Sequence, residues 1–183
     1  MTTHPIPPVY STDPQTPPHI LILGSLPSLK SRETAFFYGH PQNRFWRVMA
    51  AVLGEPVPET VEQKTALLTA HGVALWDAIA ACEITGSSDS SITNVTPTDL
   101  APILAIGTVK AVFTNGTTAT RLYTKYHYPT TGISAIPLPS TSPANAAKAL
   151  GDLVQEWQII REYLRQKSRE AHPSFLCFFA FMT

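Results

Sequence analysis

The segment FFYGHPQNRFW, residues 36–46, holds a set of side chains that could contact a ligand. Five aromatic residues stand there together with His40, Asn43 and Arg44. An asparagine amide both donates and accepts hydrogen bonds, and it needs no shifted pKa to do so. A soluble domain rarely collects these residue types only to fill a core. We therefore expect the front of the segment to contact a ligand and its last two residues to pack beneath it.

Several common catalytic motifs are absent from the 183 residues. The chain has no phosphate-binding GxxxxGKS/T loop, no GxGxxG after its first apolar run and no GxSxG. Ser25 or Ser28 could be combined with His40 and Asp77 as a hydrolase triad, which leaves a small-molecule serine hydrolase as an alternative. His40 precedes a proline and is better explained as a loop histidine that binds backbone groups.

Composition indicates a general class and leaves the partner open. The chain is long enough for one well-buried domain. Lysine plus arginine equals aspartate plus glutamate at 13 each, so net charge neither supports nor excludes a nucleic-acid partner. Two cysteines, Cys82 and Cys177, are too few for a disulfide framework, a four-cysteine zinc site or a cysteine-ligated iron–sulfur cluster. With no secretory start, we expect an intracellular protein that needs no metal and no cofactor.

Apolar runs and helix signals alternate along the chain. Buried strands are expected at residues 19–23, 73–77, 109–115 and 132–138. Helices are expected at residues 43–53, 60–72, 98–107, 117–126 and 142–166. This alternation favours parallel strands joined by helical crossovers. We predict an α/β fold, a three-layer sandwich with a central, mostly parallel four-stranded sheet.

Three of the expected helices carry start signals. Asn43 can cap the first, Thr60 and Gln63 form a possible capping box for the second, and Ser142 before Pro143 favours a long final helix.

The two ends of the chain differ from the predicted domain, residues 19–167. Residues 1–18 contain six of the 17 prolines, which predicts a disordered or loosely draped arm. Residues 168–183 end in FLCFFAFMT, which is apolar but too short to cross a bilayer, since about 20 residues are needed. This tail either packs onto the domain or remains a frayed or membrane-touching end.

The connections that follow the predicted strands carry the polar and unusual residues. In open parallel sheets, ligands bind outside the carboxyl ends of the strands. Those ends lead into residues 24–28, the stretch from Asp77, residues 115–116 and residues 139–145. The aromatic segment 36–46 lies in the first connection, so we expect one binding rim.

The strings GSLPS, HPQNRFW and LPSTSPAN, in this order, resemble the uracil-DNA glycosylase superfamily. The likeness spans about residues 19–165. Within the superfamily, the chain resembles the mismatch-specific branch and, more specifically, the related DNA-deoxyinosine, or hypoxanthine-DNA, glycosylases. It implies a four-stranded parallel sheet between helices and a pocket that receives a base flipped out of DNA.

The resemblance implies that the first motif forms the pocket floor, with the residues Gly24, Ser25, Leu26, Pro27 and Ser28. Leu26 stands where the mismatch-specific branch has the asparagine that handles the attacking water. In the deoxyinosine branch the catalytic role belongs to Asn43, whose carbonyl would orient the water. Tyr38, exposed in the pocket beside His40, would stack on the extruded base.

Two more pocket residues follow from the same comparison. Asp77 falls near the position where superfamily members read the base edge, and Asn115 could do the same from the third strand. The alternative for Asn115 is a turn with Gly116, because Asn-Gly is a common turn pair.

The late motif would supply a wedge that fills the space left by the flipped nucleotide. Its residues, together with the following asparagine, are Pro139, Ser140, Thr141, Ser142, Pro143 and Asn145. For the three hydroxyl residues, helix capping is the alternative to contact with DNA. Uracil-specific members have a histidine at the head of this motif, where this chain has Leu138. Together with Leu26, this favours hypoxanthine as the substrate, with uracil or xanthine as further candidates.

The leading hypothesis is a monofunctional DNA glycosylase that flips a deaminated base and hydrolyses its N-glycosidic bond. No lysine lies in the motifs to form a Schiff base, so an abasic site is the expected product. The alternatives are a damaged-DNA-binding module without catalysis and, third, the serine hydrolase. The expected partner is DNA containing a deaminated base, with no membrane partner, and the protein is expected to be a monomer.

Overall fold

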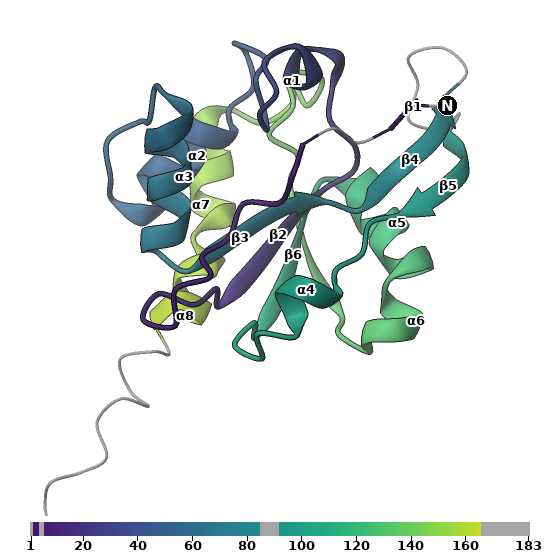
Figure 1. The fold of residues 1–183 in the computed structure, drawn as a ribbon. Coiled ribbons are helices and arrows are strands. Elements are labelled where there is room, and N and C mark those ends of the chain that lie inside the picture. Colours follow the sequence, from purple (N-terminus) through teal and green to yellow (C-terminus); the bar gives the residue numbers. More distant parts are fainter. Residues whose placement is uncertain (1, 4–5, 85–91, 166–183) are drawn as a thin grey trace, which may run out of the picture.

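A four-stranded parallel sheet forms the centre of the protein (Figure 1). The computed structural model describes residues 2–3, 6–84 and 92–165. The strands are β2 (Ile20–Gly24), β3 (Val73–Asp77), β6 (Ala111–Asn115) and β7 (Ala135–Leu138), in the spatial order β3-β2-β6-β7. Each neighbouring pair runs parallel. The predicted α/β fold with its central four-stranded sheet is confirmed.

Helices cover both faces of this sheet (Figure 1), which confirms the three layers. One face carries α2 (Phe45–Leu53), α3 (Val61–Ala70), α7 (Leu150–Trp157) and α8 (Ile159–Arg165). The other face carries α4 (Ala101–Leu104) and α5 (Thr117–Tyr126), with α6 (Tyr128–Thr131) packed on α5.

Strand β2 lies between these helical layers and is completely buried. Ile20 and Ile22 pack with the α2 and α7 side, whereas Leu21 and Leu23 pack with the α4 and α5 side. Successive side chains of a strand point to opposite faces, and both faces are covered here. Because both faces of β2 are covered, its residues form an uninterrupted apolar run at the start of the domain.

The ends of α2 and α3 follow their sequence signals. The capping box of α3 is present, because Thr60 Oγ1 accepts from the Gln63 N–H at 3.3 Å and Gln63 Oε1 accepts from the Thr60 N–H at 3.2 Å. At the start of α2, Asn43 Oδ1 accepts from the Phe45 N–H at 2.9 Å. Asn43 therefore caps a first-turn N–H, as predicted, although Arg44 occupies the N-cap position itself.

The predicted long helix from Ser142 and Pro143 is wrong. Residues 139–149 form a loop, and the helical part is divided into α7 and α8. The Arg44 guanidinium donates to carbonyl oxygens of this loop, those of Ser142, Asn145 and Lys148. Carbonyls that converge on one side chain cannot also align along a helix axis. A contact from a distant part of the chain thus overrides the local start signal.

A small antiparallel sheet was not predicted. It contains β1 (Thr2–Thr3), β4 (Ile79–Ile84) and β5 (Ile92–Pro97) in the order β1-β4-β5. Strand β5, with the sequence ITNVTP, is mostly exposed and lacks a regular apolar alternation. A weakly amphipathic edge strand gives little pattern to detect.

The described part of the proline-rich arm packs along β3. Ile6 and Val9 are buried, and Val9 exchanges two backbone hydrogen bonds with Leu75 at 2.9 and 2.8 Å. The Trp76 indole N–H donates to the Ile6 carbonyl at 3.3 Å. A disordered arm is therefore the wrong alternative for these residues. Their position covers the outer edge of β3, which would otherwise be open to pairing with another chain.

His127, between α5 and α6, makes stability depend on pH. Its Nε2 lies 2.6 Å from the Ala78 carbonyl oxygen, and its side chain is buried. Burial lowers the pKa of His127 from its ordinary value of 6.5, and the hydrogen bond to Ala78 partly opposes this. Below about pH 6.5 the unfolded chain binds a proton that the folded protein resists. The stability contributed by the neutral imidazole is present above that value and is lost as the pH falls through the lower folded pKa.

We expect His127→Gln, which keeps a side-chain donor for Ala78, to reduce this loss. Urea midpoints at about pH 8 and about pH 5 should differ less in the variant than in the wild-type protein. An equal difference in the two proteins would show that His127 does not contribute. His71→Gln is the matched control, because His71 is less buried and lies beside Glu55 at 3.1 Å.

Among the described residues, no helix is long and apolar enough to cross a membrane. The apolar tail predicted at residues 168–183, including Cys177, lies outside the described residues.

Candidate active site

The carboxyl ends of the parallel strands bring predicted site residues to one rim of the sheet. Strand β2 ends at Gly24 and β3 at Asp77, and these two residues are paired in register. Strand β6 ends at Asn115, which is paired with Leu138 at the end of β7. Asn43 reaches the same rim through hydrogen bonds with the loop that follows β7.

Gly24 allows the Asp77 carboxylate to lie against the β2 backbone. A Cβ atom at Gly24 would stand 2.0 Å from Asp77 Oδ1 and 3.1 Å from the Tyr38 hydroxyl oxygen. Any side chain at this position would therefore displace the carboxylate. Asp77 is 3% exposed, so its charge sits at a buried floor beside the phenol.

Tyr38 is held tightly at this floor. Its ring stacks on Phe45 with 4.0 Å between centroids, and its backbone has a φ of 54°, which is uncommon outside glycine. The hydroxyl oxygen is enclosed, and no side chain or backbone group of residues 6–84 or 92–165 gives it a well-aligned hydrogen bond. Burial, and then the Asp77 charge, raise the pKa of Tyr38 far above its ordinary value, which the nearby Asn115 amide opposes. Tyr38 is only partly exposed, unlike the open ring expected from the sequence.

Asn43, Thr141 and Asn115 form one hydrogen-bonded network. Thr141 Oγ1 donates to Asn43 Oδ1 at 3.0 Å and accepts from Asn115 Nδ2 at 2.9 Å. The Thr141 N–H donates to Asn115 Oδ1 at 3.0 Å. Thr141 has no exposed surface. The loop after β7 is thereby joined to β6 and to the start of α2.

Backbone donors fix the direction of each amide in this network. A backbone N–H can only donate, so the oxygen of Asn115 must face Thr141 and the oxygen of Asn43 must face the Phe45 N–H. Asn43 Oδ1 then receives two hydrogen bonds, which is its ordinary capacity. Among the described residues, no hydrogen bond engages the Asn43 NH₂ group, so the amide offers donors and not its carbonyl.

Arg44 holds the same loop by hydrogen bonds to its backbone carbonyls. Its guanidinium donates to the Ser142 carbonyl at 2.7 Å, to the Asn145 carbonyl at 2.8 Å and to the Lys148 carbonyl. Its backbone N–H donates to the Thr141 carbonyl at 3.1 Å. This structural role of Arg44 was not predicted from the sequence. The sequence signal for this role was the position of Arg44 between a polar loop and the apolar start of α2.

Comparison with known proteins identifies the family of this chain. Residues 11–177 match the family model described as the uracil DNA glycosylase superfamily. The chain belongs to that superfamily.

Individual relatives of this uracil DNA glycosylase superfamily member come from methanogenic archaea. A hypoxanthine DNA glycosylase of Methanosarcina acetivorans is 42% identical over 74 residues, and one of Methanosarcina barkeri is 36% identical over 74 residues. Each match covers 40% of this chain, and it spans about half of the relative's length, 47%. A solution NMR structure of a candidate uracil DNA glycosylase from M. acetivorans superposes with a TM-score of 0.74 at 29% identity, covering 89% of this chain and 98% of that one.

Residues 24–28, which resemble the superfamily's first motif, leave the end of β2 beside residues 78–79. The Ala78 N–H donates to the Gly24 carbonyl at 2.9 Å and the Ile79 N–H to the Ser25 carbonyl at 3.3 Å. Pro27 is buried, and Leu26 packs against the apolar cluster that contains Ile79. Ser28 caps α1 (Leu29–Glu33) by accepting from the Ser31 N–H at 3.2 Å. The Leu26 and Ser28 side chains therefore make packing and capping contacts, and these contacts do not involve Asn43.

The expected wedge residues form a self-bonded loop. Ser140 Oγ accepts from the Ser142 N–H at 3.2 Å, and the Asn145 side chain donates to the Ser140 carbonyl at 2.9 Å. The Pro139 carbonyl accepts from Trp157, while Pro143 is partly exposed. Capping of a helix, the alternative reading for the hydroxyls, is not what the structure shows.

His40 and the Asn115–Gly116 pair each have local contacts in the structure. His40 Nδ1 accepts from the Gln42 N–H at 3.1 Å, so it does bind backbone groups. Ser28 and His40 have these local partners and do not hydrogen-bond each other. The Asn115 amide is hydrogen-bonded to Thr141. Gly116 has a φ of 93°, and a Cβ atom at Gly116 would lie only 2.9 Å from the Ser140 Cβ, so glycine allows the chain to pass Ser140. The turn and the site interpretations of residues 115–116 are thus compatible.

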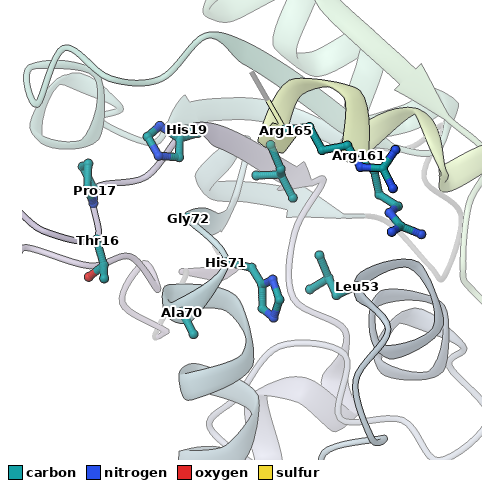
Figure 2. A pocket seen from close by; sticks show the side chains of 10 residues that line it. Thr16, Pro17, His19, Leu53, Ala70, His71, Gly72, Arg161 and Arg165 are labelled. Atoms are coloured by element: carbon teal, nitrogen blue, oxygen red, sulfur yellow. The ribbon is translucent and has the colours of Figure 1, made fainter. Parts of the chain in front are cut away.

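Two cavities of the described part of the chain lie away from this rim. One, of about 300 Å³, lies near the amino ends of β2 and β3, where Figure 2 shows His19 and Gly72 with Arg161 from α8. The second, of about 370 Å³, is lined by residues 10–14 and by residues near α4. Among the described residues, no group of three or more His, Cys, Asp or Glu side chains could hold a metal ion.

Proposed function

We propose that this protein is a monofunctional DNA glycosylase that removes a deaminated base, with hypoxanthine as its preferred substrate. The observation that carries the proposal is the buried Asp77 carboxylate at the rim where Asn43 offers its amide. Membership of the superfamily supports flipping of a base into this rim. The names of the two curated relatives support hypoxanthine.

The Asp77 carboxylate is suited to select deaminated bases. An ionised carboxylate only accepts hydrogen bonds. Deamination turns adenine, whose N1 is an acceptor, into hypoxanthine, whose N1 carries a hydrogen; cytosine and uracil differ in the same way at N3. Asp77 can therefore accept from the deaminated base, whereas the parent base would present a lone pair to it. A buried group left unpaired by the wrong base discriminates strongly.

Base entry requires a movement of Tyr38. Its hydroxyl lies beside Asp77, on the path that a base edge must take. Among the described residues the hydroxyl has no well-aligned hydrogen bond to lose, so the cost of this movement lies in the ring stacking on Phe45. Once displaced, the ring remains available for stacking on the base, as the resemblance implies.

Asn43 would act on the reaction through its NH₂ group. The bond between C1′ and the base nitrogen breaks first, and the base leaves with the electron pair. Water then adds to the oxocarbenium-like sugar and loses a proton, which leaves an abasic site. The Asn43 donors can hold the water oxygen at C1′ or stabilise negative charge on the departing base. This differs from the carbonyl role expected from the sequence, because the carbonyl is occupied by Phe45 and Thr141.

Preference for hypoxanthine over uracil rests on two leucines. Leu26 packs in an apolar cluster, and Leu138 is 5% exposed within the core. Leu138 cannot hydrogen-bond a pyrimidine oxygen as the histidine of uracil-specific members would, and Leu26 cannot handle the attacking water as the asparagine of the mismatch-specific branch would.

The first test is incubation of the protein with oligonucleotides that carry one deoxyinosine, deoxyuridine or deoxyadenosine, followed by alkaline cleavage of abasic sites. Cleavage at deoxyinosine well above deoxyuridine is expected. Preference for deoxyuridine would overturn the substrate assignment. Selective binding of deoxyinosine DNA without cleavage would instead indicate the damaged-DNA-binding module.

Changing Asp77 tests the selection argument. We expect Asp77→Asn to lower kcat/KM for deoxyinosine by about 10-fold, because an amide can still turn its oxygen toward the base, and Asp77→Leu to lower it by about 100-fold. Asp99→Asn is the matched control, since it removes the same charge from an exposed residue whose oxygen only accepts from the Ala101 N–H. Unchanged excision by both Asp77 variants would show that the carboxylate does not contact the base.

A further inference from the structure

We infer that Thr141 is a positioning residue that orients the Asn43 amide and couples it to the loop of residues 139–145. The inference rests on the function proposed above. Thr141 lies in the segment expected to enter DNA, yet its side chain has no exposed surface. It therefore cannot contact DNA in this arrangement, and its hydroxyl acts on other residues of the protein.

The network runs in one direction. The Thr141 hydroxyl has a single hydrogen, and its oxygen already accepts from Asn115 Nδ2 at 2.9 Å. The hydrogen is thus left for Asn43 Oδ1 at 3.0 Å. Asn115 cannot turn over, because its oxygen accepts from the Thr141 N–H. Asn115 therefore orients the Thr141 hydroxyl, and that hydroxyl holds Asn43 Oδ1 beside its contact with the Phe45 N–H.

The loop is also held through the next residue of the chain. While Asn43 binds the Thr141 side chain, Arg44 binds the Thr141 carbonyl through its backbone N–H at 3.1 Å. Two consecutive residues at the start of α2 thus hold Thr141 from two sides. A displacement of the loop changes both contacts together. The Phe45 N–H fixes which way the Asn43 amide faces, and the seated loop holds the amide in place through Thr141.

The hydroxyl can be tested separately from the shape of the side chain. We expect Thr141→Val, which keeps the shape, to lower the single-turnover rate of deoxyinosine excision by about 10- to 100-fold, because a misplaced catalytic group is costly. Affinity for DNA with a non-hydrolysable 2′-fluoro-deoxyinosine should stay within a few-fold. Thr141→Ser, which keeps the hydroxyl, should restore most of the rate. An unchanged rate in Thr141→Val, or equal losses in both variants, would overturn the inference.

A second variant leaves Thr141 in place. In Asn115→Asp the carboxylate still accepts from the Thr141 N–H, but it no longer donates to Thr141 Oγ1. The hydroxyl hydrogen then turns to the introduced carboxylate and leaves Asn43 Oδ1. We expect the same loss of single-turnover rate as in Thr141→Val. A full rate in Asn115→Asp would contradict the directed network.

Failure of the inference can be told from failure of the proposed function. If the wild-type protein cleaves none of the oligonucleotides, the function fails, but the positioning can still be measured by NMR. The Asn43 side-chain NH₂ resonances, assigned with an Asn43 variant, should shift or broaden in Thr141→Val and not in Thr141→Ser. Unchanged Asn43 resonances in Thr141→Val would overturn the positioning role.

Discussion

Replacing Asn43 with alanine is expected to lower the single-turnover rate of deoxyinosine excision by about 100- to 1000-fold, the range seen when one oriented donor is removed from an active site. Affinity for DNA should change little, because the Asn43 side chain is bound to Phe45 and Thr141 and carries no charge. The rate is measured with enzyme in excess, and affinity with 2′-fluoro-deoxyinosine DNA.

Alanine also removes the cap on the Phe45 N–H, which costs about 1 kcal/mol of stability. Asn43→Asp separates this effect from catalysis, because an aspartate keeps an oxygen for Phe45 and Thr141 but loses the NH₂ group. If the NH₂ group acts on the reaction, Asn43→Asp should be as slow as Asn43→Ala while unfolding at the wild-type urea concentration. If the carbonyl orients the water, Asn43→Asp should keep most of the rate.

The control for both variants is Gln42→Ala, which changes an exposed neighbour on the same loop. Its rate and stability should match those of the wild-type protein. A wild-type rate in Asn43→Ala would show that the Asn43 side chain takes no part in the reaction.

The central sheet was predictable because local sequence reports it directly. Each residue of β2 is buried by helices on one face or the other, so the strand is an unbroken apolar run. Thr60 and Gln63 likewise carry their capping box within four residues. Where an element is determined by neighbours in the chain, the sequence pattern is sufficient. Strand β5 is exposed and irregular, and no such pattern was available for it.

The candidate site was predictable as a set of residues but not as a network. The rim follows from strand ends, so Gly24, Asp77 and Asn115 could be placed together. The loop at residues 139–149 could not, because its helix signal is overridden by contacts with Arg44 from about 100 positions away in the chain. Thr141 was expected either to contact DNA in the wedge or to cap a helix, whereas in the structure it is completely buried. Side-chain hydrogen bonds between distant segments leave no periodic trace in the sequence.

Removal of the Arg44 side chain is expected to loosen that loop and to reduce both stability and excision. In Arg44→Ala, loop carbonyls lose charged donors at 2.7 and 2.8 Å, and we expect a loss of about 2–4 kcal/mol in unfolding free energy. Arg44→Lys should recover little of this, because an ammonium cannot replace a planar guanidinium that spans several carbonyls. Urea unfolding measures the stability, and protease cleavage within residues 139–149 reports the loop.

Excision by Arg44→Ala should fall by about 100-fold, because the released loop also frees Thr141 from the backbone of residue 44 and so disturbs Asn43. Arg47→Ala is the matched control, since Arg47 lies on the same helix, is exposed, and loses the same charge. A direct phosphate contact by Arg44 would give a different result, with weaker DNA binding and a smaller dependence of affinity on salt. Stability and protease resistance equal to those of Arg47→Ala, together with such a change in salt dependence, would show that Arg44 binds DNA and does not hold the loop.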